Sequence, residues 1–218
     1  MNVTTSVEIV GGQAVYTVRT ADPLYQERLL HMGFAAEDGE FVRRLSATGD
    51  VPRTHANFAR RLEEMLLQSA RRRPVPWQQA LDVFLERVED SELRWFLYGS
   101  GALAVRGIDA DPGDLDFWVD DAHLAGVLFE DLLVEPVTTM TGWVADHGGR
   151  AFAGCLFEWI AGVYDTDEPH EQRPDRLEHV HWHGHEVPVA PLDVQLAVNR
   201  RRGLDDRVRK IEAFVRQN

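Results

Sequence analysis

The feature that most constrains the fold is a run of large apolar residues, WFLY at 95–98, which stops at a glycine and a serine. The run has no charged side chain on either face, and a strand of that kind lies inside a sheet that is covered on both sides. A second, alternating run, LDFWV at 115–119, follows after a short spacer. We therefore predict a mixed α+β fold in which these two strands lie in the middle of a sheet flanked by helices.

Four aspartates lie close together just before and within the second run: Asp109, Asp111, Asp114 and Asp116. Carboxylates at such spacing repel one another unless solvent or a cation neutralises them. Because side chains two residues apart in a strand share a face, we expect Asp114 and Asp116 to point the same way. Such a pair can bind one divalent cation or share two, whereas Asp109 and Asp111 are expected to be solvated in the loop.

The beginning of the chain has the pattern of a separate small unit. Alternating residues on both sides of a Gly-Gly pair predict a hairpin over 6–19. Asp22 and Pro23 predict the start of a helix that stops at Gly33, and a further strand is expected after it. We therefore predict a small N-terminal α+β unit over residues 1–48, called the N-terminal unit below.

The rest of the chain divides into a helical and a mixed part. Two amphipathic patterns predict a connector of two linking helices over 49–93, and a larger domain would fill 94–218. Within that domain a helix is expected over 121–133 after the second central strand. A hairpin with a long second strand is expected to turn at Gly148 and Gly149.

The composition bears on partners and location. The chain has 36 Asp and Glu against 23 Lys and Arg, a net charge of -13. It therefore lacks the basic balance typical of nucleic-acid-binding proteins and favours cationic small molecules or metal ions near its clefts. The sequence shows no signal peptide and no run that could span a membrane. The single cysteine, Cys155, lies in an apolar run and fits a buried, inert thiol, so a cytoplasmic location is expected.

The stretch YGSGALAVRGIDADPGDLDFWV resembles the signature of the nucleotidyltransferase superfamily, the polymerase-beta-like group. The shared pattern is an apolar run before Gly-Ser, a spacer of about a dozen residues, and Asp-x-Asp between apolar residues. The resemblance covers roughly residues 94–214, and it is closest to the small bacterial types that modify antibiotics or act as toxin–antitoxin partners. It implies a nucleotidyltransferase-like mixed sheet.

The resemblance also implies roles for particular residues. Gly99 and Ser100 would hold phosphate, and Asp114 and Asp116 would bind Mg²⁺, with two ions expected. The family uses a third carboxylate on a later strand, usually an aspartate. Here the candidate is Glu158, an ionisable side chain in an otherwise apolar strand, which needs a partner such as a metal.

The end of the chain resembles the closing helices of the family. A helical segment is expected from about 192 to 214, with an interruption at Gly203. Its Arg202 and Asp205 match the family's Arg-x-x-Asp pattern. No phosphate-contacting lysine of the kind often found there can be placed, so Arg200 and Arg201 are the candidates for binding the triphosphate.

The implied reaction is attack by a substrate hydroxyl on the α-phosphate of a nucleoside triphosphate such as ATP, with pyrophosphate leaving. Glu158 could accept the proton. The acidic balance favours a small cationic acceptor such as an aminoglycoside, and hence a role in antibiotic resistance. Two alternatives stay open: a toxin-type enzyme acting on protein or tRNA, and a catalytically inactive nucleotide-binding or regulatory module. The base preference, the acceptor and the oligomeric state are also open.

Four alternating histidines form the other conspicuous pattern: His179, His181, His183 and His185. Imidazoles at this spacing can bind Zn²⁺. An exposed hairpin strand that packs its other face inward explains them more simply, and the turn is expected near His183. Whether this run binds metal is left open. Trp143 and Trp159 could stack on a base, although core packing is their ordinary role.

Overall fold

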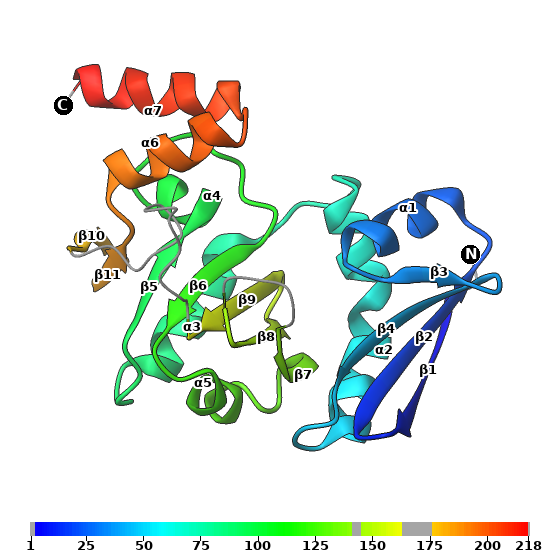
Figure 1. Ribbon diagram of the computed structural model, residues 1–218. Helices are drawn as coiled ribbons and strands as arrows, with labels where there is room; N and C mark the ends of the chain where they lie inside the picture. Colours follow the sequence, from blue (N-terminus) through cyan, green and yellow to red (C-terminus); the bar gives the residue numbers. More distant parts are fainter. Residues whose placement is uncertain (1–2, 141–144, 163–175, 218) are drawn as a thin grey trace.

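The computed structural model describes residues 3–140, 145–162 and 176–217, and it has the mixed α+β architecture expected from the sequence. Figure 1 shows a small sheet near the N-terminus and a larger sheet in the middle of the molecule, with a long helix between them. In this view, the two C-terminal helices lie on the opposite side of the larger sheet from the small one. None of the helices in the described ranges combines the length and the apolar character needed to cross a membrane.

The small sheet is antiparallel and contains β1 (Val3–Val10), β2 (Gln13–Thr20), β3 (Ala35–Glu37) and β4 (Glu40–Ser46). The strands have the order β1-β2-β4-β3. The predicted hairpin is confirmed, because β1 and β2 pair across Gly11 and Gly12, whose φ angles of 58° and 79° suit a tight turn. The strand β3 was not predicted, since three residues are too few to show a period.

The helix α1 (Pro23–His31) begins and ends where the sequence predicts. The Asp22 carboxylate accepts a hydrogen bond from the backbone N–H of Leu24 at 2.9 Å and so caps the first turn. Gly33, with a φ of 87°, ends the helix in the left-handed conformation that favours glycine.

The helix α2 (Val51–Ser69) connects the two sheets. Its Phe58 shares one hydrophobic core with Tyr16 of the small sheet, and that core also contains Val134 and Phe152 of the larger sheet. The Asn57 side chain donates hydrogen bonds to two backbone carbonyl groups at the start of a larger-sheet strand, at 2.9 and 3.1 Å. The N-terminal unit is therefore packed against the larger sheet through α2.

Within the described residues, the larger sheet has seven strands in the order β10-β11-β5-β6-β9-β8-β7. They are β5 (Trp95–Tyr98), β6 (Leu115–Val119), β7 (Leu133–Thr139), β8 (His147–Phe152), β9 (Leu156–Ala161), β10 (Glu178–Trp182) and β11 (His185–Val189). The two central strands predicted from sequence, β5 and β6, are antiparallel neighbours, and β6 is parallel to β9. The acidic end of β6 therefore lies between β5 and β9.

Helices cover this sheet and continue from its edge. They are α3 (Trp77–Val88), α4 (Gly99–Ala104), α5 (Ala122–Leu128), α6 (Leu192–Arg201) and α7 (Asp205–Gln217). On one face, Phe84 of α3 stacks on Phe117 of β6 with ring centroids 3.7 Å apart. The expected break in the last helical segment is confirmed, because Gly203 lies between α6 and α7 with a φ of 66°.

Two sequence predictions in the larger domain are wrong. Gly148 and Gly149 do not form a turn, because both lie inside β8. A Cβ at Gly149 would overlap the Trp159 ring, so this position needs glycine for close packing rather than for a bend. The helix expected over 121–133 ends at 128, since β7 begins only a few residues later.

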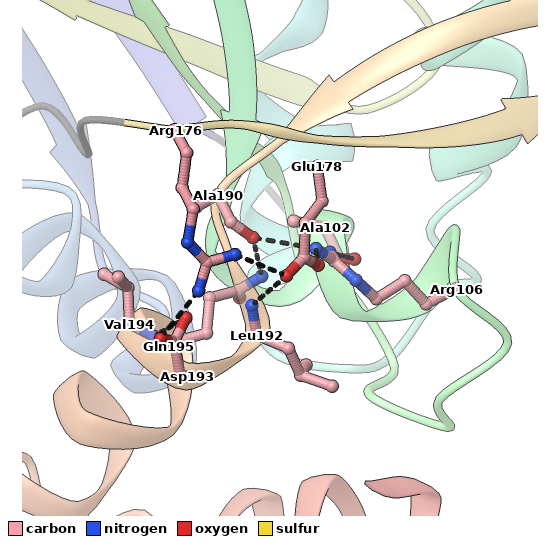
Figure 2. Close-up of polar contacts among 9 residues, drawn as sticks. All are labelled: Ala102, Arg106, Arg176, Glu178, Ala190, Leu192, Asp193, Val194 and Gln195. Atoms are coloured by element: carbon pink, nitrogen blue, oxygen red, sulfur yellow. Dashed lines mark hydrogen bonds and ion pairs between the residues drawn. The ribbon is translucent and has the colours of Figure 1, made fainter. Parts of the chain in front are cut away.

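A group of polar contacts holds the β10–β11 hairpin and α6 against α4 (Figure 2). The Arg106 guanidinium, 6% exposed, donates hydrogen bonds to the carbonyl oxygens of Ala102 at 2.7 Å and Ala190 at 2.8 Å. It also forms an ion pair with Glu178 of β10 at 2.6 Å. Because Ala102 belongs to α4 and Ala190 leads into α6, these contacts fix α6 relative to the Gly-Ser turn at the start of α4.

Candidate active site

Five side chains form a row across five adjacent strands of the larger sheet. Tyr98 of β5 pairs in register with Asp116 of β6, which pairs with Glu158 of β9. Glu158 pairs in turn with Arg150 of β8, and Arg150 with Glu135 of β7. Side chains that occupy paired positions on one face of a sheet are close neighbours. The strand register therefore places Asp116 and Glu158, two predicted site residues, next to each other.

Gly99 lies directly against the Asp116 carboxylate. Its φ is 66°, in the left-handed region, and a Cβ at this position would overlap the carboxylate. Both the backbone conformation and the space therefore require glycine here. Ser100, the next residue, is 3% exposed, so its side chain is largely covered. The structure thus brings the Gly-Ser turn and Asp116 together, as the sequence pattern predicts.

The surroundings of the two aspartates of the Asp-x-Asp pair disfavour their charged forms, because both pKa values are raised. Burial raises the pKa of Asp116 well above its ordinary value, and the charges of Asp114 and Glu158 raise it further. The guanidinium groups of Arg207 and Arg202 act in the opposite direction. A carboxylate with a raised pKa lies in an environment that resists its ionisation, and a bound cation would relieve that resistance.

Asp114 shows the same behaviour. Burial raises its pKa, the neighbouring charge of Glu158 adds to the effect, and Arg150, Arg207 and Arg71 partly offset it. Both aspartates are half-buried. Perturbed carboxyl groups that interact with one another are typical of functional sites, although structural ion pairs also perturb pKa values.

Glu158 already has a partner within the protein. Its carboxylate accepts a hydrogen bond from Arg150 Nε at 2.7 Å, and Arg150 also forms an ion pair with Glu135 at 3.3 Å. Burial alone would lower the pKa of Arg150, but the charges of Glu135 and Glu158 together hold it above the ordinary value. Arg150 was not predicted, since only the register of β8 against β9 shows that it faces Glu158. The assignment of Glu158 as a third metal ligand stays a prediction.

The C-terminal arginines differ in their relation to the site. Arg200 forms an ion pair with Glu212 of α7 at 2.7 Å, and Arg201 lies exposed in the last turn of α6. The arginines whose charges act on Asp116 are Arg202, at the end of α6, and Arg207 in α7. The sequence pattern included Arg202, but nothing in it pointed to Arg207.

Asp114 and Asp116 could bind Mg²⁺ as two carboxylate ligands, with water and substrate supplying the other ligands. Within residues 3–140, 145–162 and 176–217, no group of three or more His, Cys, Asp or Glu side chains is already arranged around a metal position. Mg²⁺ is usually held by one or two carboxylates together with water and substrate phosphates, so a complete protein cage is not required. Oxygen ligands suit this ion, and a cation would stabilise the charged forms that the surroundings of Asp114 and Asp116 disfavour.

The remaining candidates lie away from this row. Asp109 and Asp111 have side chains 89% and 78% exposed, which confirms that they are solvated. The histidine hairpin turns at His183, whose Nδ1 lies 3.0 Å from Asp82 Oδ1. Trp159 is 1% exposed and packs in the core, whereas Trp143 lies outside the described residues.

A cleft of about 320 Å³ opens beside the carboxylates, between the larger sheet and the N-terminal part of the chain. The larger domain contributes five of its lining residues: Gly113, Asp114, Arg150, Leu156 and Glu158. The Met32 carbonyl, at the end of α1, accepts a hydrogen bond from Arg150 at 3.1 Å. The cleft is therefore continuous with the row of charged residues.

No protein-family model matches the chain. No curated protein matches it either. Among solved structures, the chain is similar to a putative nucleotidyltransferase from Thermotoga maritima, with 17% sequence identity and a TM-score of 0.48. The match covers 64% of this chain and 92% of that one.

Proposed function

We propose that this protein is an Mg²⁺-dependent nucleotidyltransferase that moves a nucleoside monophosphate from a nucleoside triphosphate to a hydroxyl group of a small, cationic molecule. The observation that carries the proposal is the pair Asp114 and Asp116, half-buried, with raised pKa values, at the corner formed by Gly99. A site that concentrates carboxyl groups beside a Gly-Ser turn is suited to a metal-bound triphosphate.

The two aspartates would hold the metal, and the chain's cations would hold the phosphates. Mg²⁺ bound there would lower the pKa of the attacking hydroxyl and neutralise the charge that develops on the leaving group. The backbone at Gly99 and Ser100 is the proposed phosphate contact. Arg202 and Arg207 are better placed than Arg200 to balance the triphosphate charge, because their charges already act on Asp116, whereas Arg200 is paired with Glu212.

The proposed transfer forms one bond to the α-phosphorus and breaks another. The acceptor hydroxyl oxygen forms a bond to the α-phosphorus, the bond from that phosphorus to the bridging oxygen breaks, and pyrophosphate leaves with the electron pair. The hydroxyl proton passes to a base. Glu158 is the proposed acceptor of this proton, since it lies next to Asp116 in register and one of its oxygens is bound by Arg150 while the carboxylate still reaches the cleft.

A transfer assay tests this proposal. The protein is incubated with MgCl₂, labelled ATP, GTP, CTP or UTP, and a panel of aminoglycosides and lincosamides. Asp116→Asn should lower transfer by roughly 10³-fold, since it removes several kcal/mol of charge stabilisation in the transition state. The matched control is Asp109→Asn, an aspartate whose side chain is 89% exposed, and it should transfer at the wild-type rate.

The other outcomes decide against the proposal in different ways. Labelling of a protein or an RNA in a cell lysate, with no labelling of small acceptors, would reassign the acceptor to a macromolecule. Absence of any labelled product and of any pyrophosphate release would leave a nucleotide-binding module without turnover. Equal transfer rates for wild type and Asp116→Asn would show that the Asp116 carboxylate has no role in the reaction.

A further inference from the structure

The cleft beside the carboxylates is built by two parts of the chain that are far apart in sequence. Besides the five residues of the larger domain, the lining includes residues at the ends of α1 and α2 and one residue just after α2: His31, Met32, Met65, Gln68, Ser69 and Arg71. About half of the described lining residues therefore precede the larger domain. Nothing in the sequence pattern of residues 94–214 accounts for this half.

The cleft lies on one side of the metal-binding carboxylates, and the Gly-Ser turn lies on the other. In the sheet order, β5 with Gly99 is on one side of β6, and β9 and β8 with Glu158 and Arg150 are on the other. Asp114 and Glu158 line the cleft, whereas Gly99 does not. In phosphoryl transfer, the attacking and leaving oxygens lie roughly in line with the phosphorus. A donor held at Gly99 would therefore be attacked from the direction of the cleft.

The two parts of the wall are fixed relative to each other by an ion-pair chain. Arg43 of β4 forms an ion pair with Glu135 at 3.0 Å, and Glu135 is 3% exposed. Arg150 pairs with the same glutamate, and both arginines donate hydrogen bonds to the carbonyl of Met32. Buried charges with several partners hold one geometry. The cleft is thus preformed, which reduces the ordering cost of binding.

The charge of the cleft disfavours an anionic ligand. Its two arginines are already paired, Arg150 with Glu158 and Arg71 with Asp111 at 3.3 Å. The Arg71 guanidinium also donates a hydrogen bond to the backbone carbonyl of Asp111 at 2.8 Å. The helices α1 and α2 both end at the cleft, at His31 and Ser69, and helix C-termini carry partial negative charge.

The size and the polar groups of the wall point to a small hydroxyl compound. A volume of about 320 Å³ is at the lower end of the range for small-molecule pockets. Gln68 is held in one orientation, because its amide nitrogen donates to the carbonyl of Gly154 at 2.8 Å and to Glu64 at 3.2 Å. The side chains of Ser69 and His31 are exposed and add a hydroxyl and an imidazole. These groups can hydrogen-bond a polyol.

We propose that this cleft is the acceptor site, that the ends of α1 and α2 determine acceptor specificity, and that the acceptor is a sugar-sized hydroxyl compound without negative charge. An amine-bearing compound binds best, because the C-terminal ends of α1 and α2, which both lie at the cleft, attract a cation. The role of the cleft as an acceptor site rests on the proposed function, but binding in the cleft can be measured without turnover.

Saturation-transfer NMR with three sugars of similar shape tests the proposal: glucosamine, glucose and glucuronate, which are cationic, neutral and anionic at neutral pH. Wild-type protein should give the strongest signal with glucosamine and none with glucuronate. Ser69→Trp, which fills the cleft from the exposed end of α2, should weaken glucosamine binding by about tenfold or more. His31→Trp should do the same from the end of α1. The matched control is Ala59→Trp, an exposed position of α2 that does not line the cleft.

Each result has a definite meaning. Loss of glucosamine binding in both filling variants and retention in Ala59→Trp support the proposal. It is overturned by unchanged binding in Ser69→Trp and His31→Trp, by glucuronate binding as well as glucosamine, or by absence of binding for all three sugars. Glucosamine binding without any nucleotide transfer would keep the site and refute the proposed function. Transfer that is unaffected by Ser69→Trp would keep the function and refute the site.

Discussion

Replacing Asp116 by asparagine should make the metal-free protein more stable while it destroys activity. In the folded protein this carboxyl group is buried beside Asp114 and Glu158, and its pKa is raised for that reason. In the unfolded chain it ionises freely. Folding at neutral pH therefore confines a charge that the surroundings resist, and asparagine, which has a similar shape and no charge, removes this cost.

The geometry of the strand sets the magnitude. Asp114 and Asp116 are two residues apart in extended chain, which separates them by about 6–7 Å. At an effective dielectric constant of about 20, two unit charges at that distance repel by about 2.5 kcal/mol. Glu158 adds to the repulsion, and Arg202 and Arg207 reduce it. We expect Asp116→Asn to raise the free energy of unfolding by about 1–3 kcal/mol, and the Tm by about 2–4 °C for each kcal/mol.

The change of the free energy of unfolding with pH should show the same sign for Asp116→Asn. A carboxyl group with a raised folded pKa keeps its proton in the folded state after the unfolded state has lost it. The free energy of unfolding therefore falls as pH rises from about 4, the unfolded value, to the raised folded pKa. Asp116→Asn lacks this fall, so its advantage over wild type should be largest at neutral pH and should shrink toward pH 4.

Urea denaturation followed by circular dichroism measures both effects, with EDTA and with MgCl₂. Mg²⁺ should stabilise wild type by binding the folded state, and should stabilise Asp116→Asn less. Asp109→Asn, which changes an exposed side chain, should behave like wild type in both buffers. A variant that is less stable than wild type in EDTA at neutral pH, or that responds equally to Mg²⁺, would refute the reasoning.

Three further predictions concern Gly99, Arg150 and Cys155. Gly99→Ala should lose more stability and activity than Gly203→Ala in urea denaturation and transfer assays. Both glycines have a φ of 66°, but only a Cβ at Gly99 meets a carboxylate. Equal effects of the two substitutions would contradict this reason. Arg150→Met should lower the free energy of unfolding by about 3–5 kcal/mol, because it removes one of the cations that balance the buried charge of Glu135. The double variant with Glu135→Gln should recover part of this loss. No recovery would contradict the pairing of Arg150 with Glu135. Burial raises the pKa of Cys155 to about 12. A maleimide should therefore label this thiol only as the protein unfolds in urea. Fast labelling of the native protein would contradict its burial.

Local patterns in the sequence determined much of the fold around the site. The apolar run before Gly99, the alternation around Asp116 and the cap at Asp22 depend on neighbours a few residues away, and all three lie where they were predicted. Such features can be read from sequence because the strand period, the left-handed conformation of glycine and helix capping are local properties of the backbone.

Only the tertiary structure decided which charges meet at the site. Glu158 was expected to need a partner such as a metal, and the register of β8 against β9 places Arg150 beside it. A shift of one residue in that register would move Arg150 to the other face, and nothing near it in sequence specifies the register. The same holds for Arg207, whose charge acts on Asp116 because α7 packs against α4 through Ile211 and Leu103.

The role of the N-terminal unit was also decided by tertiary packing. The amphipathic pattern of α2 shows that one face is buried, but it does not show that this face packs against the small sheet and the larger one together. The ends of α1 and α2 reach the cleft because the Arg43–Glu135–Arg150 contacts bring segments about a hundred residues apart into one cluster. Local periodicity therefore determined the strands and helices of this protein, whereas long-range register and packing decided which of their side chains share a site.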